Sequence, residues 1–438
     1  LWIGDVGISG IDAVGEILSG KVNPSGSLVD TYCYNNYSAP AMVNFVPVAY
    51  EGSDDDAVPE KARTYMVYQE GIYVGYKYYE TRYEDYVMKK GNAGDYDYRA
   101  DVAFPFGYGL SYTDFAYRDM EVSYHSDTDQ FEISVTVTNT GDTYAGKETV
   151  QIYVQSPYTA YDVKNGVEKA AVALCGFGKT DVLEPGGSQT LQIYVDKRDL
   201  ASYDAYGCGT YMLDKGDYYL TAATDAHHAV NNILAAKGYR AKDGRMDADG
   251  SKELTYKWKN AKQDTTSYAT SLNGTPITNQ LSASDLNLSE DLDGQKITYL
   301  SRSDWTGTFP TEAVKLRLTE KLTAKLQDVQ YDAAAYEEVE MPVLGADNGL
   351  KLVDLIGVAY DDPKWDELLD QLSFDDMVSL IGDSFHWTMP IESVQAPGTR
   401  DENGPQGLTA SLFQAGDEKG KTALVATAFT SEDVMAAT

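Results

Sequence analysis

Carboxylates dominate the chemistry that this sequence can offer. Its 438 residues hold 68 Asp and Glu against 35 Lys and Arg, a formal net charge of −33. An ionised carboxylate can act as a nucleophile, and a carboxyl group kept protonated by its surroundings can act as an acid. Two short motifs set a carboxylate among polar or aromatic neighbours: Ser303-Asp304-Trp305, and a polar loop in which Asp401 stands two residues before Asn403. Each needs a suitable structural context to act.

Residue types and spacing disfavour several other chemistries. The 3 cysteines form no Cys-x-x-Cys pair and the 4 histidines form no His-Glu-x-x-His motif, which argues against structural zinc and against a metalloprotease centre. Gly15 to Lys21 resembles a phosphate-binding loop, but Val22 stands where a hydroxyl residue is required. Asp54 to Asp56 lacks the EF-hand pattern and is interpreted as a solvated loop. We therefore expect no cofactor and no metal.

The charge also narrows the class of partner. An excess of negative charge argues against nucleic acid and against an anionic membrane surface. No apolar run approaches the ~18 residues that a membrane-spanning helix needs. The 35 tyrosines and 5 tryptophans suit a neutral partner with hydroxyls to bond and apolar faces to stack on.

The first thirty residues show the order of strand, helix and strand that is typical of an α/β unit. Residues 1–3 are predicted to end a buried strand, residues 11–19 to form a helix that stops at Gly20, and residues 27–29 to resume a strand. Residues 68–79 form an aromatic run that is predicted to be strand-like. Its tyrosines are interpreted as packing residues rather than as a platform for a sugar.

Strict alternation of apolar and polar residues then predicts a β-sandwich of about seven strands between Tyr117 and Thr224, of the immunoglobulin or fibronectin type III kind. A slip of one residue would turn every apolar side chain outward. The core candidates are Ile133, Val135, Val137, Ile152, Val154, Ile193 and Val195. The preceding residues 104–112 are predicted to be a linker that buries its aromatic side chains.

The pattern changes twice beyond the sandwich. Residues 240–345 are polar with scattered apolar runs, and are interpreted as a long connector or insertion. Apolar residues then recur at helical spacing up to Ile381, and Ser373 with Asp376 three residues later predicts a helix start. Another helix is predicted near Ser431.

Taken in order, these stretches resemble glycoside hydrolase family 3. The resemblance is carried by Asn-Pro-Ser-Gly at 23–26, Tyr-x-Glu-Gly-Ile-Tyr-Val-Gly-Tyr at 68–76, Phe-Pro-Phe-Gly-Tyr-Gly-Leu-Ser-Tyr at 104–112 and Asn-Gly-Pro-Gln-Gly at 403–407. It implies a multidomain α/β plus all-β chain. The implied segments are the tail of an α/β sandwich with its linker at 1–116, a fibronectin type III-like domain at 117–225, a connector or insertion at 226–355 and the start of a (β/α)8 barrel at 356–438. Most members place the barrel first, so this sequence resembles a fragment from the subgroup with reversed domain order.

The resemblance implies a retaining β-glycosidase that removes non-reducing terminal β-linked glucose or a similar sugar from oligo- or aryl β-glycosides. In the family the nucleophilic Asp lies late in the barrel and the acid/base Glu lies in the α/β sandwich. Both are expected outside this sequence, so no catalytic residue is assigned. Asp304 has the family's nucleophile tripeptide but precedes the barrel, and is interpreted as part of the connector.

Two residues are candidates for contact with the sugar. Asn403 stands where the family has an Asp that bonds sugar hydroxyls. Either Asn403 does so more weakly, or Asp401 substitutes for it, or the loop is plain surface.

A second class of function remains open. The sandwich could belong to a non-catalytic carbohydrate-binding or adhesion module, although such a module would not carry the barrel-like stretch at 372–429. The sugar, the linkage, the oligomeric state and the compartment stay open.

Overall fold

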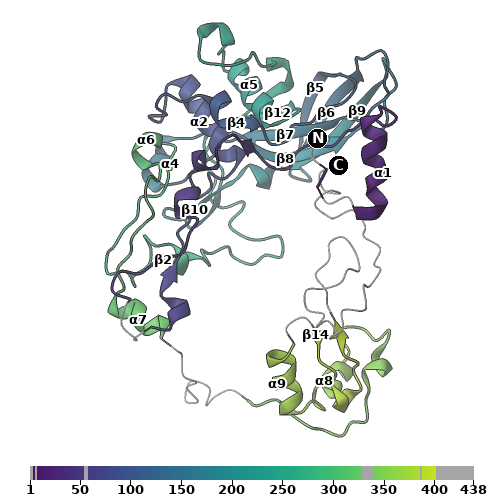
Figure 1. Cartoon of the computed structure of the whole chain (residues 1–438), viewed down its shortest axis with the longest axis vertical. Coiled ribbons are helices and arrows are strands. Elements are labelled where there is room, and N and C mark those ends of the chain that lie inside the picture. Colours follow the sequence, from purple (N-terminus) through teal and green to yellow (C-terminus); the bar gives the residue numbers. More distant parts are fainter. Residues whose placement is uncertain (1–2, 5–6, 54–57, 328–339, 385–386, 401–438) are drawn as a thin grey trace, which may run out of the picture. The chain divides into compact units, whose positions relative to one another are not determined.

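The computed structural model describes residues 3–4, 7–53, 58–327, 340–384 and 387–400. The chain divides into two compact units: Gly15–Val329 with Ala436–Thr438, and Leu1–Val14 with Gln330–Met435. Figure 1 shows the elements coloured along the sequence.

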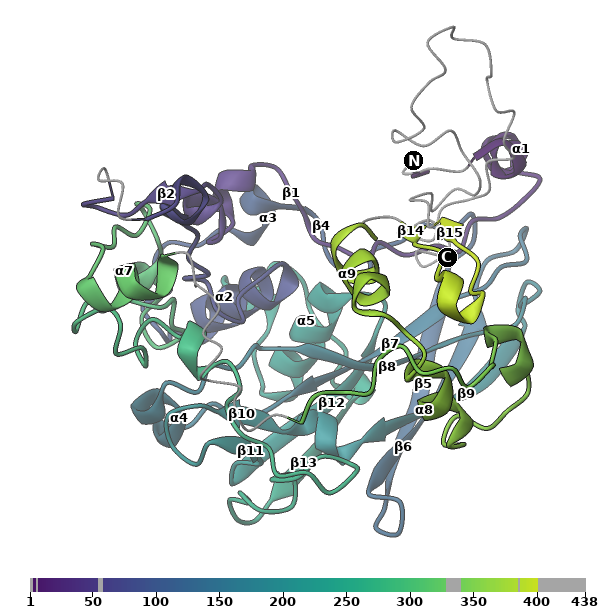
Figure 2. The same ribbon diagram turned by 90° about the horizontal axis from the view of Figure 1, so that it is seen from below.

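A sandwich of two antiparallel sheets forms the centre of the larger unit, as predicted (Figures 1 and 2). One sheet has the order β5-β6-β9, with β5 at Phe115–His125, β6 at Gln130–Asn139 and β9 at Ser188–Asp196. The other has the order β13-β12-β7-β8, with β13 at Thr255–Asn260, β12 at Gly216–Ala223, β7 at Thr149–Gln155 and β8 at Ala173–Lys179. All seven predicted core residues are buried between the sheets. A short hairpin of β10 (Ser202–Asp204) and β11 (Thr210–Met212) stands apart from both sheets.

One sandwich strand lies in the stretch that the sequence left as a connector. β13 pairs with β12, with Trp258 opposite Tyr218. The Trp258 ring packs on Tyr218 and on Phe131, at centroid distances of 5.1 and 5.5 Å. Because the remaining positions of β13 are Lys, Tyr, Thr and Asn, its pattern lacks the regular apolar alternation that identifies a strand.

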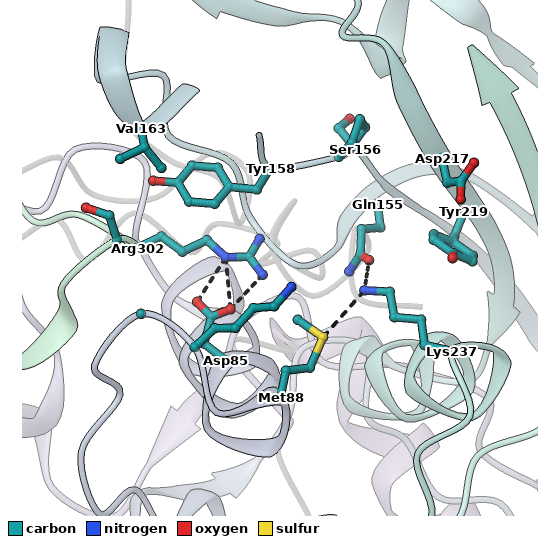
Figure 3. Close-up of a pocket in the computed structure, with 14 residues that line it drawn as sticks. Asp85, Met88, Gln155, Ser156, Tyr158, Val163, Asp217, Tyr219, Lys237 and Arg302 are labelled. Atoms are coloured by element: carbon teal, nitrogen blue, oxygen red, sulfur yellow. Dashed lines mark hydrogen bonds and ion pairs between the residues drawn. The ribbon is translucent and has the colours of Figure 1, made fainter. Parts of the chain in front are cut away.

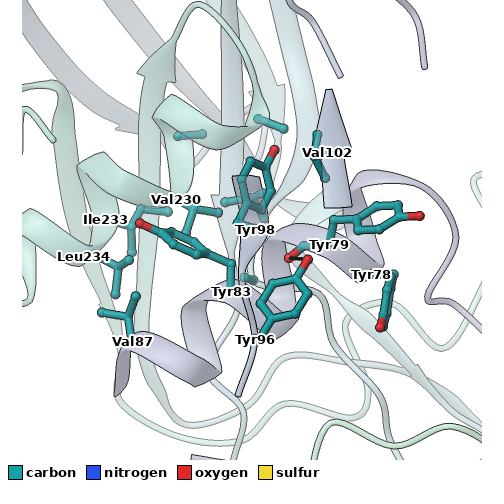
Figure 4. Close-up of a cluster of buried hydrophobic side chains, with 14 of the residues drawn as sticks. Tyr78, Tyr79, Tyr83, Val87, Tyr96, Tyr98, Val102, Val230, Ile233 and Leu234 are labelled. Carbon is teal, nitrogen blue, oxygen red and sulfur yellow. Dashed lines mark hydrogen bonds between the residues drawn. The ribbon is translucent and has the colours of Figure 1, made fainter. Parts of the chain in front are cut away.

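The aromatic run at residues 68–79 is not a strand, and this prediction is wrong. Its last four residues begin helix α2 (Tyr76–Met88), whose Tyr79, Tyr83 and Val87 recur at intervals of four and are buried together. Figure 4 shows Tyr83 and Val87 beside Val230, Ile233 and Leu234 of α5 (Ala226–Ala236). Alternating tyrosines fit a half-buried strand and the start of a helix equally well, so the period alone could not decide. Tyr73, Tyr78 and Tyr79 of the run do pack in the core, as expected.

The remaining elements of the first hundred residues are short. β1 (Tyr32–Cys33) pairs antiparallel with β4 (Val102–Phe104), which follows the single-turn helix α3 (Tyr98–Asp101). Helix α1 spans Gly7–Leu18, close to the predicted helix. Residues 27–29 form no strand, although Leu28 exchanges backbone hydrogen bonds of 2.8 Å with Gly107 and Tyr108.

The predicted linker at residues 104–112 docks through its backbone more than through its side chains. Phe106 packs against the core, but Phe104, Leu110 and Tyr112 are 44%, 72% and 44% exposed. The expectation that its large side chains are buried is therefore wrong for these three. What holds the segment is polar: Gln151 donates to the Gly107 carbonyl, and Ala226 N–H donates to the Phe106 carbonyl.

Residues 286–326 fold back onto the first hundred residues instead of hanging free. They include α6 (Trp305–Thr308) and α7 (Glu320–Leu326), and they share a small core with Val67 and the β2–β3 hairpin (Val48–Ala49 and Thr64–Tyr65). The Tyr65 hydroxyl donates to the Val314 carbonyl at 2.7 Å. The apolar residues of this stretch are too scattered to show a period, so only their partners reveal the core.

The smaller unit contains α8 (Lys364–Leu369), α9 (Phe374–Gly382), β14 (Trp387–Thr388) and β15 (Thr399–Arg400). The predicted helix start is confirmed: Ser373 and Asp376 form a reciprocal capping box. No residue of α9 is fully buried. The predicted helix near Ser431 lies outside the described residues.

Candidate functional site

A pocket of about 480 Å³ opens in the larger unit where α2, α5 and the end of β7 meet (Figure 3). Helix α2 contributes Asp85 and Met88 to its lining, and the carboxyl end of α5 contributes Lys237. Tyr219 comes from β12, and Arg302 comes from residues 286–326, which we call the returning segment. Ligand pockets are typically about 300–1,000 Å³, so a cavity of this size can hold a small molecule. The pocket is therefore the first place to look for chemistry.

A buried ion network forms the floor of this pocket. The Arg302 guanidinium donates to Asp85 through Nε and Nη2, both at 2.9 Å, and Nη2 also reaches Glu84 at 2.6 Å. The side chains of Arg302, Glu84 and Asp85 are 5%, 0% and 2% exposed. Removing one member would leave an uncompensated charge in the protein interior. The network therefore holds the pocket wall in one geometry.

Lys237 completes the network from α5. Its ammonium lies 2.6 Å from Glu84 Oε1 and also donates to Gln155. Burial alone would raise the pKa of Glu84, but Lys237 and Arg302 together lower it to about 2. Glu84 is thus ionised at neutral pH, so it cannot serve as the protonated acid that a retaining glycosidase requires. The network therefore has the features of a binding or structural site.

Local backbone geometry brings the returning segment to α2. Helix α2 ends with Lys89 in the left-handed conformation, and Gly91 follows at φ 60°. A Cβ at Gly91 would lie 2.2 Å from the Arg302 carbonyl oxygen, so only glycine allows this approach. Trp305 N–H then donates to the Gly91 carbonyl at 2.8 Å, and the fully buried Trp305 indole donates to Asp85 at 2.9 Å.

Asp304, the carboxylate in the Ser-Asp-Trp motif, caps α6. Its Oδ1 accepts from Gly307 N–H at 3.1 Å and from the Asn92 amide at 2.7 Å. It does not line the pocket, and its hydrogen bonds explain it as a helix cap. This agrees with its interpretation as part of a packed connector.

The other candidates from the sequence do not gather at this pocket. Asn403 and Asp401, the predicted sugar contacts, lie outside the described residues, as do the acidic residues 54–56. Tyr73, Tyr78 and Tyr79 are buried, which leaves them no face for a ligand. Gly15, the first glycine of the stretch that resembles a phosphate-binding loop, lies inside helix α1 and not in a loop.

A second charged cluster surrounds His227 on α5. The His227 ring contacts Glu80 at 2.9 Å through Nδ1 and Asp247 at 2.9 Å through Nε2, and it stacks on Tyr98 at 3.9 Å between centroids. Burial alone would lower the pKa of His227, but the two carboxylates raise it to about 10. His227 is therefore a buried cation at neutral pH, and it joins α2, α5 and the loop at Asp247.

Two negative observations concern the described ranges only. Within them, no group of three or more His, Cys, Asp or Glu side chains has the arrangement of a metal site. In the same part of the chain, no helix combines the length and the apolarity that crossing a membrane takes.

Sequence reasoning missed the ion network because its members are far apart along the chain. Arg302 and Asp85 are separated by 217 residues, and Lys237 lies between them. The available signal was charged residues set among aromatic ones, in Tyr-Glu-Asp-Tyr at 83–86 and Leu-Ser-Arg-Ser-Asp-Trp at 300–305. Such charges are buried only when they are paired.

The chain was compared with known proteins. Residues 148–226 match the family described as Fibronectin type III-like domain. A β-glucosidase of Ruminococcus albus is 36% identical over 233 residues, which cover 52% of this chain and 20% of that protein. β-Glucosidase A of Butyrivibrio fibrisolvens is 36% identical over 239 residues, covering 51% and 24%. The chain thus spans about a fifth to a quarter of the length of these curated relatives.

A likeness of fold extends further than the likeness of sequence. The solved structure of a β-glucosidase from Paenibacillus barengoltzii matches with a TM-score of 0.52 at 23% identity, covering 91% of this chain and 37% of that one. Over about half of its length, the chain is thus similar in sequence to these β-glucosidases, and it carries a fibronectin type III-like sandwich together with a mixed α/β region.

Proposed function

We propose that this chain is part of a retaining β-glycosidase that hydrolyses non-reducing terminal β-linked glucose or a similar sugar. The observation that carries the proposal is the 36% identity over 233 residues to the β-glucosidase of R. albus. The substrate would be an oligo- or aryl β-glycoside. Catalysis needs two carboxyl groups roughly 5–5.5 Å apart, one ionised and one protonated. We place both outside this sequence.

The domain order is part of the same proposal. Residues 356–438 would begin a (β/α)8 barrel that follows the sandwich, and Asn403 or Asp401 would bond sugar hydroxyls in a loop of that barrel. The proposed order rests on the resemblance of Asn-Gly-Pro-Gln-Gly at 403–407 to the start of the family's barrel, because these residues follow the sandwich in the sequence.

The test compares the 438-residue chain with the complete product of its gene on an aryl β-glucoside. We expect hydrolysis by the complete product and none by the 438-residue chain. If the 438-residue chain alone hydrolyses the substrate and Asp304→Ala abolishes this activity, the interpretation of Asp304 as a connector residue and the placement of the catalytic groups elsewhere are both wrong. Absence of hydrolysis by a folded complete product would overturn the proposed activity.

A further inference from the structure

The pocket between α2, α5 and β7 has a preformed lining. Every charged group on its floor already has partners: Arg302 holds Asp85 and Glu84, and Lys237 holds Glu84 and Gln155. Side chains fixed in this way lose little freedom when a ligand arrives. The cavity therefore resembles a binding site whose geometry does not depend on its ligand.

The charges that surround the pocket balance one another. Its cations are Lys90, Lys237 and Arg302, and they are matched by the lining carboxylates Asp85 and Asp217 together with Glu84 behind them. This is unusual in a chain whose net charge is −33. The carboxyl ends of α2 and α5, which both reach the pocket, carry partial negative charge and oppose an anion. The three lining cations likewise disfavour the binding of a cationic ligand.

Unused hydrogen-bonding capacity remains on the pocket wall. The Lys90 ammonium and the Tyr219 hydroxyl have no hydrogen-bond partner within the part of the chain that the structure describes. The Lys90 ammonium can only donate hydrogen bonds, whereas the Tyr219 hydroxyl can both donate and accept them. The rings of Tyr158 and Tyr219 add apolar wall, and Figure 3 shows them on opposite sides of Gln155. A sugar suits this lining, because its hydroxyl groups can bond to Lys90 and Tyr219 and the apolar face of its ring can pack on the tyrosine rings.

We propose that this pocket binds a neutral mono- or disaccharide without cleaving it. The inference goes beyond the proposed hydrolysis, because it concerns a cavity that holds none of the catalytic carboxyl groups. A small, partly open site of this kind should bind weakly, with Kd of about 1–10 mM.

The test is ligand-detected NMR on the 438-residue chain with D-glucose and cellobiose, and with glucose 6-phosphate and glucosamine as charged comparators. We expect the neutral sugars to bind, and each charged analogue to bind at least about tenfold more weakly. Equal binding of either charged analogue would overturn the argument from charge balance. No binding of the neutral sugars at 100 mM, about ten times the weakest expected Kd, would overturn the site itself.

A matched pair of variants locates the binding. Val163, on α4 (Ala160–Asn165), lines the pocket and is 51% exposed, whereas Val182 is 56% exposed and lies elsewhere on the same unit. Val163→Trp should fill the mouth of the pocket and abolish binding, and Val182→Trp should leave it unchanged. Thermal unfolding of both variants verifies that they fold. Unchanged binding in folded Val163→Trp would overturn the proposal, and neither result bears on hydrolysis by the complete gene product.

Discussion

The Arg302 guanidinium and the Asp85 carboxylate form a two-point ion pair in the protein interior, with both N–O distances at 2.9 Å. Asp85 also accepts the Trp305 indole N–H at 2.9 Å. The pair closes a loop of 217 residues that contains the whole sandwich. It therefore holds residues 286–326 against α2.

Arg302→Met should lower the free energy of unfolding by about 3–5 kcal/mol, because Glu84 and Asp85 would remain buried with one cation fewer. Urea unfolding at neutral pH measures this. Arg240→Met is the matched control: Arg240 is exposed, and its loss should cost no more than about 0.5 kcal/mol. A cost below about 1 kcal/mol for Arg302→Met would show that water reaches the two carboxylates.

Gly91→Ala should cost much more stability than Gly186→Ala, although both glycines have positive φ, 60° and 77°. A methyl group at Gly91 meets the Arg302 carbonyl oxygen at 2.2 Å, whereas a Cβ at Gly186 meets nothing within 4 Å. We expect about 1–2 kcal/mol for Gly186→Ala and at least about 3 kcal/mol for Gly91→Ala. Thermal unfolding compares them, and equal costs would mean that backbone strain alone acts at both sites.

Stability should fall as the pH rises above 6.5, because His227 retains its proton in the folded chain up to a pKa of about 10 and loses it near 6.5 when unfolded. In that window the folded state binds more protons, which corresponds to a loss of about 1.4 kcal/mol per pH unit for one such group. Urea unfolding between pH 6.5 and 9.5 measures the slope.

His227→Gln should reduce that slope without abolishing it, because the hydrogen bond to Asp225 raises the pKa of the neighbouring His228 as well. An unchanged slope in His227→Gln would place the pH dependence in other groups.

Asp304→Ala should leave β-glucoside hydrolysis by the complete gene product intact. Its cost should appear in stability instead, at about 0.5–2 kcal/mol, because the variant removes the cap of α6 and the bond to Asn92. Asp304→Asn keeps a capping oxygen and should recover most of the loss. A fall in hydrolysis of more than about 100-fold, in a protein that still folds, would instead make Asp304 a catalytic group.

Where local periodicity coincides with burial, the sequence was sufficient. The alternation at Phe131–Val137 predicted both the strand and which of its faces is buried, because only one register hides the apolar side chains. The capping box at Ser373 was equally predictable from the sequence, because its hydrogen bonds join residues only three positions apart. The resemblance of the motifs at 68–76 and 104–112 pointed to the relatives that the comparisons then found.

Where the partner is distant, only the tertiary structure decided. The tyrosines at 73–79 carry no signal that separates a strand from the start of α2, because the choice depends on packing against α5. β13 is a strand because Trp258 finds Phe131 and Tyr218. Arg302 is a structural cation because folding brings it to Asp85. Burial and pairing are properties of neighbours in space, and a local pattern records only neighbours along the chain.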